Sequence, residues 1–135
     1  GLSFILANGS SSSFQTRSLK DVSIHEIDLT KHPHVYMIFQ KDCEACHQQV
    51  SDLNCLETPV TLIGGFASER DLRKEYRKMK SDFQVVLGTS ELLKALGASK
   101  NLTPQTILIT NSKKLHFTGL TTCTKMKKAT QGVAL

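Results

Sequence analysis

The chain has 135 residues, 39% of them hydrophobic, and a formal net charge of +5 from 17 Lys+Arg against 12 Asp+Glu. This length and apolar content suit one globular domain with its own core. The basic residues are scattered over Arg70 to Lys80 and Lys113 to Lys128, a pattern typical of solvated helix faces, so we expect no nucleic-acid partner. Four cysteines are too few for a disulfide scaffold and fit one redox pair plus two others.

The N-terminal residues differ in composition from the rest of the chain. Leu2 to Ala7 is apolar but too short to span a membrane, and a polar tract from Asn8 to Ser13 follows it. This pattern fits the end of a signal peptide, or of a membrane anchor that lies upstream of residue 1; a vector-derived or disordered leader fits equally well. We therefore expect a flexible leader or linker over residues 1–19 and one domain over residues 20–135.

The first half of that domain begins with a strand over residues 22–29, where apolar and polar residues alternate. His32-Pro33-His34 interrupts the pattern, and both histidines are expected in a loop. The apolar run of residues 35–39 predicts a central strand buried on both faces. A helix is expected to start at or near Cys43 and to end around Asn54.

The second half alternates strands with helices and ends in a hairpin. Ser68 is expected to cap an amphipathic helix whose apolar side holds Leu72, Tyr76 and Met79. Gly97 is expected to stop the next helix. The expected strands cover residues 60–66, 83–87, 105–110 and 115–118, and the helices residues 69–80, 90–96 and 122–129. This order predicts an α/β fold with a mixed sheet and helices on both of its faces.

Cys43 and Cys46 form a C-x-x-C motif at the start of the predicted active-site helix. A spacing of one helical turn puts both sulfurs on one face, within reach of a disulfide. The helix N-terminus favours a thiolate on Cys43, so Cys43 is the predicted attacking sulfur and Cys46 the resolving one. Glu44 and His47 flank the pair and are predicted to modulate it, Glu44 by disfavouring the thiolate and His47, when protonated, by favouring it. Alternatively, His47 is simply an exposed residue of the first helical turn.

Two other readings of this motif remain open. Cys43 to His47 also matches C-x-x-C-H, the attachment pattern of c-type haem. Cys43, Cys46, His47 and Cys55 together have the ligand types of a zinc site. A strand-rich apolar pattern speaks against a small cytochrome, and no second paired ligand motif supports zinc. A redox dithiol without metal or cofactor is therefore the preferred interpretation.

The strand and helix from Val35 to Cys46, with Thr103-Pro104 just before a hairpin strand, resemble the thioredoxin fold. Cys43-Glu44-Ala45-Cys46 is similar to the motif of the TlpA/ResA branch of exported thiol-disulfide oxidoreductases, and the resemblance covers residues of about 20 to 130. It implies a three-layer sandwich with a mixed central sheet, and a cis-Pro104 that faces the cysteines. It also implies that Thr103, Pro104 and Phe39 contact substrate.

The same resemblance predicts the biological setting. It implies disulfide exchange with protein thiols or disulfides, with a redox partner protein, in the periplasm or another extracytoplasmic space. Two positions depart from the family pattern: Asp42 stands where Trp is usual, and Met37 where a buried acid is usual. The loss of that proton acceptor for Cys46 leaves a second hypothesis open, a redox-inactive thioredoxin-fold adaptor in an envelope assembly.

The family's topology argues against a bond between the other two cysteines. It places Cys55 at the far end of the active-site helix, while the last hairpin strand delivers Cys123 to the catalytic end. A strand of about six residues spans roughly 20 Å, whereas disulfide Cα atoms lie about 4.4 to 6.8 Å apart. Only an irregular loop would bring Cys55 and Cys123 together.

Overall fold

The computed structural model describes residues 12–132. Within that range no helix is long and apolar enough to cross a membrane. The elements follow one another in this order: β1 (Ser13–Arg17), β2 (Ile24–Asp28), β3 (His34–Phe39), α1 (Glu44–Asp52), a 3₁₀ turn (Leu53–Cys55), β4 (Val60–Gly64), α2 (Glu69–Met79), β5 (Gln84–Leu87), α3 (Ser90–Leu96), β6 (Gln105–Ile109), β7 (Lys114–Thr118) and α4 (Cys123–Gly132).

Strand β3 lies at the centre of a five-stranded sheet with the order β5-β4-β3-β6-β7. It pairs in parallel with β4 and antiparallel with β6, which makes the sheet mixed, as predicted. Every residue of β3 after His34 is buried, because both faces of a central strand are covered. Alternate side chains therefore enter two different cores.

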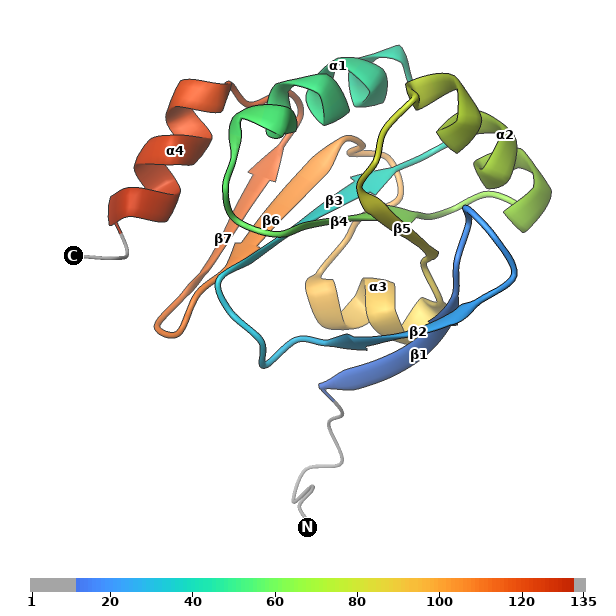
Figure 1. The fold of residues 1–135 in the computed structure, drawn as a ribbon, viewed down its shortest axis with the longest axis horizontal. Helices are drawn as coiled ribbons and strands as arrows, with labels where there is room; N and C mark the ends of the chain where they lie inside the picture. The colour runs from blue at the N-terminus through green and yellow to red at the C-terminus, as the bar shows by residue number, and fades with distance from the viewer. Residues whose placement is uncertain (1–11, 133–135) are drawn as a thin grey trace, which may run out of the picture.

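Those two cores give the molecule its three layers. Val35, Met37 and Phe39 pack in one cluster with residues of α1, α2 and α4, whereas Tyr36 and Ile38 pack in the other with β2 and α3. Figure 1 shows α1, α2 and α4 on one face of the sheet, with α3 and the β1–β2 ribbon on the opposite face. The predicted three-layer α/β sandwich is thereby confirmed.

The folded domain starts earlier than predicted. Strand β1, which falls in the expected leader, pairs antiparallel with β2 in a separate two-stranded sheet. Ser18 then bridges to Val86 of β5, and Leu19 is only 2% exposed. A methyl group on Gly64 would come within 2.8 Å of the Leu19 side chain, so the packing here is tight. The boundary at residue 19 was wrong, and the expected apolar leader segment lies outside the described residues.

Two helix-terminus predictions are confirmed. The Ser68 side chain accepts the N–H of Asp71 at 3.1 Å and so caps α2. Gly97 ends α3 in the left-handed conformation, with φ 73°, which glycine adopts without a steric penalty. His34, in contrast, is not in a loop: it is the first residue of β3, and its ring hydrogen-bonds to Thr61 Oγ1 at 2.8 Å.

Cys55 and Cys123 form a disulfide with a Cα–Cα distance of 6.1 Å, so the argument against this bond was wrong. After β7 the chain turns back along α1 instead of starting α4 at the catalytic end. The turn is held by Gln49, which is fully buried on α1. Its amide donates to Thr121 O at 3.0 Å and accepts the Thr121 N–H at 2.7 Å. This pair of hydrogen bonds fixes the chain before Cys123 against α1, so that Cys123 lies next to Cys55 at the far end of that helix.

Candidate active site

The Cys43–Cys46 pair lies where β3 ends and α1 begins, and the two sulfurs form a disulfide with a Cα–Cα distance of 5.2 Å. Cys43 is the N-cap of α1, and its Sγ accepts the Cys46 N–H at 3.1 Å. The same N–H would stabilise a thiolate at that position after reduction. Cys43 is half-buried, whereas Cys46 is 0% exposed. Only Cys43 can therefore be reached by another protein.

This difference in exposure predicts the order of labelling. After full reduction, a limiting amount of iodoacetamide near neutral pH is expected to modify Cys43 well before Cys46, by about tenfold or more, because the helix N-terminus favours the Cys43 thiolate and burial disfavours that of Cys46. Mass spectrometry of the peptides measures both. Preferential labelling of Cys46 would contradict the assigned roles.

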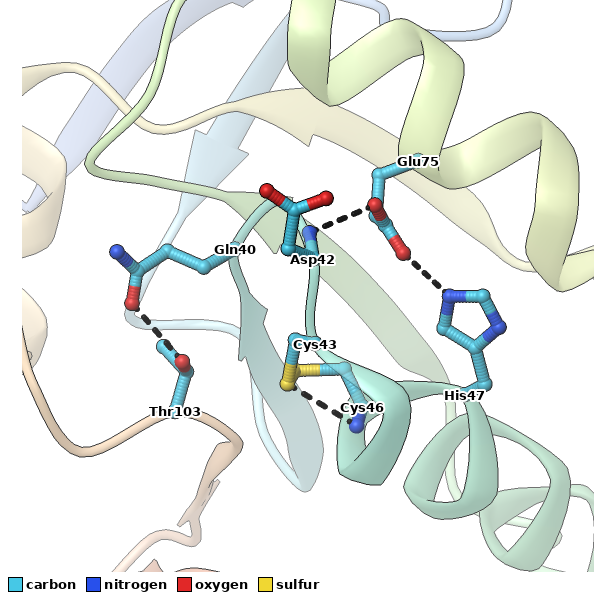
Figure 2. The surroundings of a disulfide bond; sticks show 7 residues. All are labelled: Gln40, Asp42, Cys43, Cys46, His47, Glu75 and Thr103. Atoms are coloured by element: carbon cyan, nitrogen blue, oxygen red, sulfur yellow. Dashed lines mark hydrogen bonds and ion pairs between the residues drawn. A yellow bond between two sulfur atoms is a disulfide. The ribbon is translucent and has the colours of Figure 1, made fainter.

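The loop before β6 is tied to the same end of the sheet. The Thr103–Pro104 peptide bond is cis, as the resemblance implies. Thr103 Oγ1 donates to Gln40 Oε1 at 2.9 Å, which fastens this loop three residues before Cys43 (Figure 2). Pro104 is buried and Thr103 is half-buried. Thr103 is thus the member of this pair that a substrate can reach.

Phe39 is not part of a surface that a substrate can contact. Its side chain is 0% exposed and belongs to the core cluster beneath α1 and α2. The alternation of β3 explains this, because Phe39 points to the same face as Val35 and Met37. The prediction that Phe39 contacts substrate was wrong.

A residue that the sequence analysis missed contacts the residues on both sides of the C-x-x-C motif. Glu75 of α2 is 4% exposed, and its Oε1 accepts the Asp42 N–H at 2.8 Å while its Oε2 contacts His47 Nε2 (Figure 2). Burial acts to raise the pKa of Glu75, but the hydrogen bonds from His47 and from the Asp42 N–H outweigh it and hold that pKa below its ordinary value. Glu75 is therefore ionised at neutral pH. The sequence did contain a signal for this buried acid, because Glu75 falls on the apolar stripe formed by Leu72 and Tyr76.

The two predicted modulating residues differ in their surroundings. Glu44 is exposed in the first turn of α1. The His47 side chain is 25% exposed and pairs with Glu75, so His47 is not simply an exposed residue of this turn. The four zinc-ligand candidates are not brought together, since Cys55 is bonded to Cys123 and His47 contacts Glu75.

Comparison with known proteins supports the architecture. No protein-family model matches the chain, and no curated protein is similar in sequence. Among solved structures, a secreted Mycobacterium tuberculosis disulfide oxidoreductase homologous to E. coli DsbE is 11% identical, with a TM-score of 0.68, over 88% of this chain and 95% of that one. StoA from Bacillus subtilis is 12% identical, with a TM-score of 0.65, over 86% and 94%.

A third solved structure is described as a thiol:disulfide interchange protein of the thioredoxin family from Chlorobium tepidum. It is 14% identical, with a TM-score of 0.69, over 91% of this chain and 94% of that one. At such low identity these similarities establish the thioredoxin fold.

Proposed function

We propose that the protein is a thiol-disulfide oxidoreductase that exchanges disulfides with protein substrates through Cys43 and Cys46. The observation that carries this proposal is a disulfide between a half-buried cysteine at a helix N-cap and a fully buried cysteine. That asymmetry suits an attacking and a resolving thiol. No metal or cofactor is needed, because the two sulfurs supply both electrons of the exchange.

In the reducing direction, the Cys43 thiolate attacks one sulfur of a substrate disulfide. A mixed disulfide forms, and the other substrate sulfur leaves as a thiolate that takes up a proton. The Cys46 thiolate then attacks Cys43 Sγ, which breaks the mixed disulfide and releases the second substrate thiol. Two electrons pass to the substrate, and the Cys43–Cys46 disulfide is restored. The reverse sequence oxidises a substrate dithiol, and a redox partner protein returns the pair to its starting state.

The loops around the cysteines offer a surface for a polypeptide substrate. We infer that Thr103 presents its backbone to an extended segment, since the cis-Pro104 that follows lacks an N–H. Two of the exposed large hydrophobic side chains, Leu102 at 47% and Leu120 at 55%, lie in the loops at this end. The Gly119 N–H donates to Pro104 O at 2.8 Å and joins these two loops. Apolar side chains beside the substrate cysteine would contact both leucines.

We further propose an extracytoplasmic location. Both disulfides suit an oxidising compartment, and the Cys55–Cys123 bond has no part in the exchange chemistry. One structurally similar protein is described as secreted. An upstream signal peptide or anchor belongs to the same proposal.

Two measurements test the function. In glutathione redox buffers, the Cys43–Cys46 pair of the full chain is expected to interconvert between disulfide and dithiol with a defined equilibrium constant. A pair that stays oxidised in all buffers would instead support the redox-inactive adaptor, which the apolar Met37 favours. Mass spectrometry after thiol alkylation follows each pair separately.

Trapping tests the order of attack. Cys46→Ala is expected to accumulate mixed disulfides with substrate proteins through Cys43, because the resolving thiol is gone. Cys43→Ala is the matched control and should trap at least about tenfold less, since Cys46 is fully buried. Non-reducing gels of cells that express each variant measure this. Equal trapping by both variants would contradict the proposed roles.

A further inference from the structure

One buried side chain is bonded to both flanks of the redox pair. Glu75 accepts the N–H of Asp42, the residue before Cys43, and contacts the ring of His47, the residue after Cys46 (Figure 2). Asp42, Cys43 and His47 come from the turn and first helical turn that follow β3, whereas Glu75 comes from α2. The C-x-x-C turn is thereby fastened from behind at two points.

The first of these points is a backbone bond at an uncommon conformation. Asp42 has φ 56°, in the left-handed region that aspartate tolerates better than most residues. The Asp42 N–H has no hydrogen-bond partner inside α1, because the helix begins only at Glu44. Glu75 Oε1 supplies that partner at 2.8 Å. The bond keeps the chain in the turn that makes Cys43 the N-cap.

The second point is the contact between Glu75 and His47, which is a charge pair when His47 is protonated. The side chains of Glu75 and His47 are 5% and 25% exposed, so salt screens their charges less than those on the surface. A protonated His47 favours a nearby thiolate and an ionised Glu75 disfavours it. Because the two charges are opposite and in contact, their effects on Cys43 largely cancel.

Other charged groups face Glu75 from the neighbouring elements. A cavity of about 130 Å³ is lined by Glu75 with Lys41, Asp42, Asp71, Lys74 and Lys78, and Glu44 lies exposed on the first turn of α1. The Lys41 Nζ lies 3.5 Å from Asp71 Oδ2. Besides Glu75, three lysines and two aspartates line the cavity, and these groups stay unchanged when Glu75 or His47 is replaced.

We propose that Glu75 is a positioning residue of the redox centre: it holds the Asp42 turn and His47, and it balances the charge of His47 beside the Cys43 thiolate. This inference rests on the proposed exchange function of Cys43. When His47 is protonated, loss of the Glu75 carboxylate alone then leaves an uncompensated positive charge near Cys43, and loss of the His47 side chain alone leaves an uncompensated negative one.

The test compares Glu75→Gln, His47→Gln and the double variant in the full chain. Glutamine keeps an oxygen that can accept the Asp42 N–H, so the turn is retained. After reduction, Cys43 is alkylated with iodoacetamide at about pH 5.5, where an imidazole normally carries its proton, and the pH profile is then recorded. Peptide mass spectrometry gives the rate at Cys43 alone.

Opposite shifts are expected from the two single variants. Glu75→Gln should raise the alkylation rate at about pH 5.5 by about threefold to tenfold, and His47→Gln should lower it by a similar factor. The double variant should return to within about twofold of the original rate, because the charge pair is removed as a unit. Glu69→Gln is the matched control on α2, since Glu69 is ion-paired with Arg73 and Arg17, and it should leave the rate unchanged.

Shifts of the same sign in both single variants, or a Glu75→Gln rate equal to that of Glu69→Gln, would overturn the proposal. If Glu75→Gln does not fold, the double variant decides against His47→Gln: a rate within about twofold of the original supports the charge balance, and a rate as low as that of His47→Gln overturns it. The exchange function is judged separately by the glutathione equilibrium of the unaltered chain. If the unaltered chain does not equilibrate with glutathione but the variants still shift the alkylation rate, the exchange function is wrong and the positioning role of Glu75 stands.

Discussion

Removal of the Cys55–Cys123 disulfide is expected to lower the free energy of unfolding by about 4 kcal/mol. The bond joins residues separated by 68 positions, and a cross-link over so long a loop restricts the unfolded chain strongly. It also anchors the start of α4, whose Met126 is fully buried. Urea unfolding of Cys55→Ala/Cys123→Ala at neutral pH, without reductant, measures the loss.

The matched control is Cys43→Ala/Cys46→Ala. That disulfide closes a separation of only 3 positions, so loop closure alone makes its contribution about 3 kcal/mol smaller. Equal destabilisation by the two double variants would show that the Cys55–Cys123 bond is not a structural cross-link. Thiol exchange by Cys43 should survive in Cys55→Ala/Cys123→Ala at temperatures where the variant stays folded.

Met37→Asp is expected to lower the free energy of unfolding by about 3 kcal/mol or more. Met37 is 0% exposed and lies in the same core cluster as Cys46. The substitution therefore removes apolar contacts and buries a carboxyl group among hydrophobic side chains. The introduced carboxyl group would also lie on the Cys46 side of the sheet. As a proton acceptor for Cys46, it should speed disulfide reductase turnover in the fraction that folds.

Met37→Leu serves as the control, because it keeps the volume and should cost less than about 1.5 kcal/mol. Its turnover should equal that of the original chain. Thermal unfolding and a protein disulfide reduction assay measure the two effects. An unchanged turnover in folded Met37→Asp would show that another acid, such as Glu44 or Glu75, already serves Cys46.

The parts of the fold that sequence analysis predicted well depend on neighbours in the chain. The apolar run before Cys43, the Ser68 cap and the Gly97 stop act within a few residues, so they can be recognised without a tertiary structure. The Thr103-Pro104 step was recognised through its resemblance to a known family, and its cis bond is present. Strand β1 was missed because Ser13–Arg17 contains a single large apolar side chain, Phe14, next to a serine-rich tract.

Glu75 shows why the candidate site was only partly predictable. On a helix with so many charges, an acid looks like part of a solvated face, and its partner His47 is 28 positions away. The helical spacing of Leu72, Glu75, Tyr76 and Met79 nevertheless places this acid on the buried stripe. An acidic residue on an apolar stripe is therefore a signal for a buried polar contact.

The sequence by itself determined the C-x-x-C helix start, the alternation of strands and helices, and which cysteine caps the helix, because these features depend on local spacing and on helix-end chemistry. The tertiary structure alone decided the rest. Phe39 turned inward because β3 is covered on both faces, and Cys123 reached Cys55 because Gln49 holds Thr121 across 72 positions of chain. Contacts of this kind depend on where separate elements meet in space, which no local pattern specifies.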